Sequence, residues 1–272
     1  MHTDGHIHLW NENSIPDNVF PEKMKKARIS GGILFSLPPP SFRKEVNMSA
    51  SARLTHLFAW QKLQPSLWPF FWVDPMESDA EIQLEKAAEA GVCGFKVICD
   101  YFFPYDERPM KIFQRIADMK MPLVLHSGCL VNGRASSNFN RPMNFECLIN
   151  IKNLRFSMAH IGWPWCDEYI TLFLLLKEQE KKNPQSCKMF VDNTAGTPDI
   201  YREPVFQTLF SVCEPKERMY FGADQILENY DDCKVAWYTN RDDELYRKLG
   251  LSSDEIYDIN VNNLKRFVEG VF

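Results

Sequence analysis

Short apolar runs alternate with longer amphipathic stretches along the whole chain, and the alternation occurs eight times. Runs of four to seven residues, rich in Val, Ile, Phe and Leu without polar alternation, are typical of strands buried on both faces, as in parallel sheets. The expected strands are His6–Leu9, Gly32–Leu37, Pro69–Val73, Val92–Ile98, Pro122–His126, Leu154–His160, Lys188–Val191 and Met219–Gly222.

The stretches between these runs carry helical patterns. In Met110–Lys120 the apolar positions Ile112, Phe113, Ile116 and Met119 form one helical stripe. In Glu77–Ala90 apolar residues stand among Ala and Glu, and Gly91 follows as a stop signal. The other expected helices are Asn47–Gln64, Tyr169–Leu176, Asp242–Leu249 and Ser253–Glu269, the last with Ser253 as its N-cap.

Successive strands start roughly 25 to 40 residues apart, which is the span of one β-loop-α-loop unit. Eight such units in 272 residues predict a single (β/α)8 TIM barrel that occupies residues 1–272 as one domain. An open doubly wound sheet is disfavoured, because no Gly-x-Gly-x-x-Gly follows any expected strand.

Composition and charge exclude several classes of protein. A net charge of −5 argues against nucleic-acid binding, and the one short basic cluster, Lys23-Met24-Lys25-Lys26, is interpreted as the solvated face of a helix. No segment reaches the roughly 18 uncharged apolar residues of a membrane span. The eight cysteines contain no Cys-x-x-Cys pair and indicate reduced thiols, and a first strand beginning near Asp4 leaves no room for a leader. We therefore expect a cytoplasmic protein.

Polar residues with metal-binding side chains stand where the apolar runs stop. His6 and His8 are alternate residues of one strand, so their imidazoles point to the same side and can converge on one metal. His126, His160 and Asp224 end or directly follow the fifth, sixth and eighth runs. In a parallel barrel these ends lie on one face, where barrel active sites are found. The combination predicts a metal site.

These residues stand in motifs that resemble those of the amidohydrolase superfamily. The chain is most similar to the amidohydrolase-related branch, which includes decarboxylases acting on aminocarboxymuconate-type acids, and the resemblance runs from Asp4 to Phe267. The motifs that carry it are Asp4-Gly5-His6-Ile7-His8, Gly94-Phe95-Lys96, Pro122-Leu123-Val124-Leu125-His126-Ser127-Gly128, Ala159-His160-Ile161-Gly162, Phe221-Gly222-Ala223-Asp224 and the C-terminal Ile259–Phe267.

The resemblance implies that His6, His8, His126 and Asp224 are metal ligands. It implies that His160 beside them is a proton shuttle or a further ligand. Lys96 stands where binuclear relatives carry a carboxylated lysine that bridges two metals, but in the decarboxylase-like branch a lysine there does not establish a second metal. Gln225-Ile226 departs from the x-Pro that many members carry after the eighth-strand Asp, so the following loop is expected to differ.

Imidazoles and one carboxylate suit one divalent metal, most favourably Zn2+, with Mn2+, Fe2+ or Co2+ as alternatives; Mg2+ and Ca2+ prefer oxygen ligands. Bound zinc lowers the pKa of its water to about 7, so a metal-bound hydroxide would serve as the nucleophile. Either His160 or Asp224 would then act as the base. The sequence leaves that choice open.

The residues expected around the metal are less specific. Arg134, Arg141 and Arg202 follow the fifth and seventh strands, where a guanidinium could clamp a substrate carboxylate. Trp163 is a candidate pocket wall. Asp192 ends the seventh strand and is expected to make a structural hydrogen bond.

We expect a metal-dependent hydrolase of a small amide, lactone or ester. A non-oxidative decarboxylase or hydratase of a small unsaturated carboxylic acid would use the same residues, and a catalytically silent metal-binding barrel is a third alternative. The expected partner is a small molecule. If one of the three arginines reaches the pocket, this molecule is expected to carry a carboxylate. Neither a nucleic acid nor a membrane is expected, and a homo-oligomer stays open.

Overall fold

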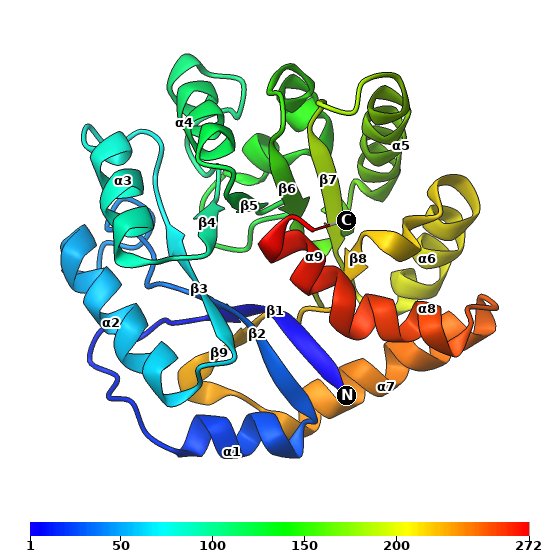
Figure 1. The fold of residues 1–272 in the computed structure, drawn as a ribbon, viewed down its shortest axis with the longest axis horizontal. Helices are drawn as coiled ribbons and strands as arrows, with labels where there is room; N and C mark the ends of the chain where they lie inside the picture. The colour runs from blue at the N-terminus through cyan, green and yellow to red at the C-terminus, as the bar shows by residue number, and fades with distance from the viewer. Residues whose placement is uncertain (272) are drawn as a thin grey trace.

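Each of the eight apolar runs overlaps a strand, and all strands pair in parallel, so the barrel prediction is confirmed. The computed structural model describes residues 1–271 and shows helices arranged around a ring of strands (Figure 1). The strands are β1 His2–His8, β2 Ile29–Phe35, β3 Leu67–Trp72, β4 Gly94–Val97, β5 Pro122–Leu125, β6 Arg155–Met158, β7 Lys188–Asp192, β8 Met219–Tyr220 and β9 Gln225–Ile226.

The eighth run continues into two short strands, which is why the structure has nine strands where eight were expected. β8 pairs with β7, and β9 pairs with β1 through Ile7↔Gln225 and His8↔Ile226. Between them the Gly5 backbone N–H donates to the Phe221 carbonyl at 2.8 Å. The segment 219–226 therefore joins both edges of the sheet and closes the barrel.

Each expected helix overlaps a helix of the structure, but α7 begins ten residues earlier than expected and α5 is longer at both ends. The helix α1 was indicated only by its basic cluster, and α6 was not expected. Two further differences lie near the C-terminus. The N-cap of α8 is Ser252 rather than Ser253, because Ser252 and Glu255 form a reciprocal capping box. A π-helical turn, η6 Asp258–Asn262, separates two α-helices in the stretch expected as one. The α-helices are α1 Val19–Lys26, α2 Ala50–Leu63, α3 Ala80–Ala90, α4 Glu107–Asp118, α5 Cys166–Lys182, α6 Asp199–Cys213, α7 Asp232–Lys248, α8 Ser253–Tyr257 and α9 Asn263–Glu269.

Two features place short helices near the carboxyl ends of the strands. The connection from β5 to β6 uses 3-10 helices in place of an α-helix, and another 3-10 helix follows β6 directly. The 3-10 helices are η1 Ser137–Asn140, η2 Pro142–Asn150, η3 Ala159–Gly162, η4 Pro215–Glu217 and η5 Leu227–Asn229. No helix among the described residues is long and apolar enough to cross a membrane.

The helix α9 covers the amino-terminal end of the barrel, and in Figure 1 it lies across the centre of the ring. Its Phe267 packs against the rings of Phe70, Phe190 and Tyr220, which point into the barrel. Arg155, the first residue of β6, donates to the Phe267 carbonyl and ties the helix to this end. Aromatic side chains therefore fill the amino-terminal end of the barrel interior, and the cavity lies at the carboxyl ends of the strands.

Candidate metal centre

The carboxyl ends of the strands bring the five predicted residues together. Asp224, between β8 and β9, contacts three imidazoles through its two carboxylate oxygens. Its Oδ1 lies 3.4 Å from His8 Nε2 and 3.7 Å from His6 Nε2, and its Oδ2 lies 4.0 Å from His160 Nε2. The ring of His126 is centred 4.9 Å from that of His160. Residues more than 200 positions apart in the chain thus share one centre.

Two of the imidazoles are oriented by hydrogen bonds at their far nitrogens. His6 Nδ1 lies 2.6 Å from Asp192 Oδ2, and His160 Nδ1 lies 2.9 Å from Thr194 Oγ1. The Nε2 atoms of both rings are therefore directed toward Asp224. A carboxylate on the far side of a histidine fixes the ring and increases its basicity as a ligand. The hydrogen bond expected of Asp192 is present, and its partner is a histidine of the site.

The donors of the centre, buried imidazoles and the exposed Asp224 carboxylate, fit a divalent transition metal. His126 Nε2 is buried and has no hydrogen-bond partner, an arrangement that costs about 1–3 kcal/mol unless something binds the atom. Ligand atoms of His6, His160 and Asp224 all lie within 4.8 Å of one another. Imidazole nitrogens combined with one carboxylate are the donors that zinc and its neighbours in the first transition row prefer.

Burial sets the charge of the imidazoles. It lowers the pKa of His6, His8 and His126 and brings that of His160 to about 4, because a buried ring holds a proton poorly. Burial also disfavours the ionised form of Asp224, but the hydrogen bond with His8 and the surrounding imidazoles hold its pKa well below the usual value. At neutral pH the centre thus offers uncharged imidazoles and one carboxylate.

Lys96, on β4, is the only lysine among the residues that line the cavity described below. Its Nζ lies 3.1 Å from His6 Nε2, and its side chain is fully buried. Burial lowers the pKa of Lys96 to about 8, against the opposing effect of Asp192 and Asp224. A protonated Lys96 would oppose a metal cation at His6.

The backbone at the centre adopts left-handed conformations that are uncommon outside glycine. His160 and Ile161 in η3 have φ of 63° and 46°, and Asp224 has φ of 53°. Such residues cost on the order of 1–3 kcal/mol and persist where surrounding contacts hold them. Thr194 accepts from the His160 backbone N–H at 2.9 Å, and Thr197 donates to its carbonyl at 2.8 Å. These two threonines hold the turn that presents His160.

The five residues lie at the base of a cavity of about 360 Å³. Above them the walls are mostly aromatic and aliphatic, and Trp163, predicted as a wall, is among them. The lining residues are His6, His8, Trp10, Trp72, Lys96, Ile98, His126, Cys129, Leu130, Val131, His160, Trp163, Gly196, Asp224 and Ile226.

The three arginines predicted to bind substrate do not line this cavity. Each guanidinium is instead paired with a carboxylate, so the expected contact with a substrate carboxylate stays a prediction. Arg134 and Arg141 are partly exposed, whereas Arg202 is almost completely buried. The partners are Asp100 for Arg134 at 2.6 Å, Glu168 for Arg141, and Asp242 for Arg202 at 2.5 Å.

Two polar residues of the site were not singled out from the sequence. Asp4 Oδ1 accepts from the His6 backbone N–H at 3.1 Å and from that of Ala223 at 2.8 Å, so it joins β1 to the residue before Asp224. Its place in the Asp-Gly-His-Ile-His motif was the available signal. Thr194 carried no signal, because only the fold brings it to His160.

Gly196 leaves room for the His160 ring. A Cβ at this position would lie 2.5 Å from His160 Nδ1 and 2.7 Å from His160 Cγ, and the φ of Gly196 is outside the left-handed region, so an alanine is opposed by the His160 side chain and not by its backbone conformation. We expect Gly196→Ala to displace the ring and lower turnover by about 10²-fold, while the unfolding temperature changes little. Steady-state kinetics and thermal unfolding check this, with Ala195→Ser as the control. Unchanged turnover would show that the ring tolerates displacement.

A parallel barrel with a histidine-rich site at the carboxyl ends of its strands places the chain among the TIM-barrel enzymes. The model of the amidohydrolase family matches residues 3–263, and the chain belongs to this family. The resemblance seen in the sequence is thereby confirmed. The chain is an enzyme of the amidohydrolase superfamily, whose members are generally metal-dependent.

Solved structures share the fold at low sequence identity. A probable 2-pyrone-4,6-dicarboxylic acid hydrolase from Acinetobacter baumannii, with citric acid bound, has a TM-score of 0.63 and 13% identity over 99% of both chains. A 2,6-dihydroxybenzoate decarboxylase complexed with 2,6-dihydroxybenzoate has a TM-score of 0.69 and 11% identity over 99% of both chains. Dihydroorotase from Campylobacter jejuni has a TM-score of 0.58 and 14% identity over 100% of this chain and 83% of that one. No curated protein matches the chain.

Proposed function

We propose that this enzyme hydrolyses a small amide, lactone or ester at a single divalent metal held by His6, His8, His126 and Asp224. The observation that carries the proposal is the convergence of the His6 and His8 imidazoles on the Asp224 carboxylate, with His126 lining the same cavity. Zn2+ is the metal that this donor set favours, with Mn2+, Fe2+ or Co2+ as alternatives. When bound, it would supply a Lewis acid and make water acidic enough to react near neutral pH.

His160 is assigned the proton transfer in this proposal. Its Nε2 faces Asp224 Oδ2 at 4.0 Å, and Thr194 holds the opposite nitrogen of the ring. Because burial lowers the pKa of His160 to about 4, the ring is neutral at pH 7, and its Nε2 has a lone pair that faces the proposed metal site. The ring would accept a proton at this nitrogen during the reaction and then donate it to the leaving group.

The cavity walls indicate the kind of substrate. Trp10, Trp72 and Trp163 line the cavity with Leu130 and Val131, so these walls contact apolar or aromatic parts of the substrate. No arginine is among the lining residues, and a substrate carboxylate would find Lys96 as its cationic partner. We therefore propose a small substrate in which an apolar or aromatic group adjoins the scissile carbonyl.

A substrate screen tests the proposal. The metal-free protein and its Zn2+ and Mn2+ forms are incubated with small amides, lactones and esters, and separately with unsaturated and aromatic carboxylic acids while CO2 release is measured. We expect metal-dependent hydrolysis of at least one compound in the first group. CO2 release from the second group, without hydrolysis in the first, would assign decarboxylation. A protein that binds neither metal would overturn the metal site.

Lys96→Met should change how metal binding depends on pH. In the parent the ammonium opposes a metal at His6, so affinity should rise by up to about tenfold per pH unit below pH 8, where Lys96 loses its proton. The variant should bind more tightly at pH 7 and show a flatter dependence, measured by titration with Zn2+. The exposed Lys152→Met serves as the control. Two metal equivalents in the parent, lost in Lys96→Met, would instead establish a bridging lysine.

A further inference from the structure

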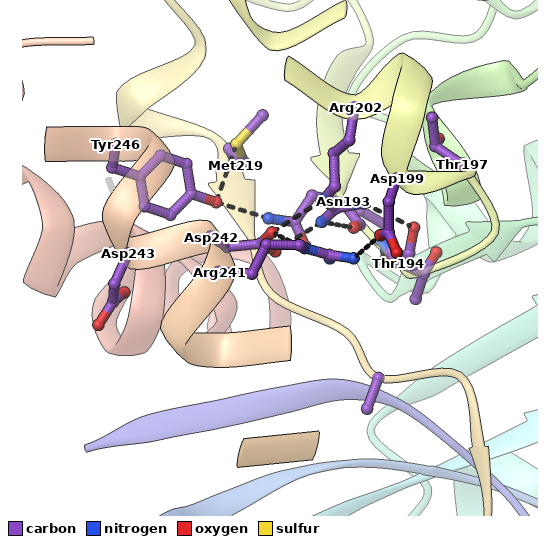
Figure 2. Close-up of polar contacts among 12 residues, drawn as sticks. Asn193, Thr194, Thr197, Asp199, Arg202, Met219, Arg241, Asp242, Asp243 and Tyr246 are labelled. Carbon is purple, nitrogen blue, oxygen red and sulfur yellow. Dashed lines mark hydrogen bonds and ion pairs between the residues drawn. The ribbon is translucent and has the colours of Figure 1, made fainter. Parts of the chain in front are cut away.

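A buried ion pair lies outside the cavity and joins two helices of the outer ring. Arg202 on α6 donates to Asp242 on α7 from Nε at 2.7 Å and from Nη2 at 2.5 Å, and both side chains are only 2% exposed (Figure 2). A buried pair of this kind often contributes no net stability, because both charges lose their hydration. The other contacts of Arg202 therefore indicate what the pair does in the fold.

The guanidinium also holds the backbone that follows β7. Nη2 of Arg202 donates to the Asn193 carbonyl at 2.7 Å, and Nη1 approaches the Thr194 carbonyl at 3.5 Å. From α7, the Tyr246 hydroxyl accepts from the Asn193 side-chain amide at 2.5 Å. Figure 2 shows these contacts meeting at Asn193 and Thr194. Two helices thus fix two successive residues at the end of one strand.

Thr194 and Asp192, on either side of Asn193, orient two imidazoles of the site. Thr194 Oγ1 contacts both the ring Nδ1 and the backbone N–H of His160, each at 2.9 Å. The Thr194 backbone N–H donates to Asp192 Oδ1 at 3.1 Å, and the other oxygen of Asp192 lies 2.6 Å from His6 Nδ1. Any shift of this backbone would move the groups that hold His160 and His6.

We infer that Arg202, clamped by Asp242, is a positioning residue that fixes the Asn193–Thr194 backbone so that Thr194 holds the His160 ring toward Asp224. Arg202 is 1% exposed and does not line the cavity, so it acts through Thr194 and not on the substrate. The consequence for catalysis rests on the proposed role of His160. The orientation of the ring can be measured without any substrate or metal.

Arg241 supplies a matched control. It contacts the same Asp242 carboxylate at 2.9 Å and Asp199 at 2.5 Å, and none of its hydrogen bonds goes to Asn193 or Thr194. An Arg→Lys substitution at either position keeps a positive charge near Asp242. At Arg202 the single ammonium cannot span both the carboxylate and the backbone carbonyls. The two variants therefore separate the charge from the contact with the strand end.

The experiment compares ring resonances of the histidines by 1H–15N NMR on the metal-free protein, with His160 assigned by His160→Asn. The parent and Arg241→Lys should show one well-defined tautomer for His160. Arg202→Lys should broaden or shift this signal, and Thr194→Val should do the same, whereas Thr194→Ser should restore the parent signal. In the Arg202→Lys, Thr194→Val double variant the change should be no larger than in Thr194→Val alone.

Turnover on a substrate found by the screen gives a second measurement. Arg202→Lys should lower kcat by about 10- to 100-fold with little change in KM, whereas Arg241→Lys should not. A His160 signal in Arg202→Lys that matches the parent would overturn the inference. If Arg202→Lys does not fold, Asp242→Glu displaces the clamp and is read in the same way. Failure of the parent to bind Zn2+ would reject the proposed function, while the NMR comparison would still decide the positioning role.

Discussion

Replacing His6 by Asn should remove the metal and lower turnover by more than about 10²-fold. The loss should be larger than that caused by removing a residue that only hydrogen-bonds to a metal ligand. His6 is the residue on which most of the site depends. Its Nε2 lies 3.7 Å from Asp224, and its Nδ1 is held by Asp192. Elemental analysis after dialysis and steady-state kinetics measure the two effects.

The control for this substitution is His56→Asn, which removes an imidazole from α2 whose hydrogen bonds go to Ser14. It should keep the metal content and the activity of the parent. A His6→Asn protein with a full metal equivalent would show that the ligands lie elsewhere, and the donor set proposed around Asp224 would have to be abandoned.

Replacing His160 by Asn should lower turnover by roughly 10² to 10⁴ while the metal content stays near that of the parent, because the substitution removes a proton-transfer group and leaves four ligands. The expectation depends on geometry, since Thr194 holds the ring so that Nε2 faces Asp224. Metal analysis and kcat are measured on the same preparation, so that the two effects can be separated.

The same experiment can assign His160 differently. Its ligand atom lies within 4.8 Å of those of His6 and Asp224, close enough for it to bind the metal itself. A loss of metal in parallel with activity would make His160 a ligand, and the proton transfer would then have to be assigned to Asp224.

The barrel could be predicted because its strands are buried on both faces and interrupted at regular intervals. His6, His8, His126, His160 and Asp224 could be found for a related reason. Polar residues that stop an apolar run stand at the carboxyl end of a parallel strand, and those ends meet on one face. The rule needs only the approximate ends of the strands, which the sequence shows to within a few residues.

The role of Arg202 could not be predicted in this way. Its position after β7 matched that of a residue facing the cavity, but the side chain turns toward Asp242 on the next helix. That carboxylate stands 40 residues further along the chain, and no local pattern links the two. Thr194 could not be identified from the sequence for the same reason, because its contact with His160 forms only when β6 and β7 lie side by side.

The division of the last barrel strand into β8 and β9 has a consequence for the order in which the molecule forms. Until the segment 221–226 has been synthesised, β1 has a partner only on the side of β2, and its other edge is unpaired. Chains emerge from the ribosome with the N-terminal part first, and an unpaired edge invites association with other chains. Asp224 lies within this segment, directly before β9. The segment that covers this edge therefore also brings Asp224 to the histidines, and a nascent chain that ends before Asp224 lacks one of the proposed metal ligands.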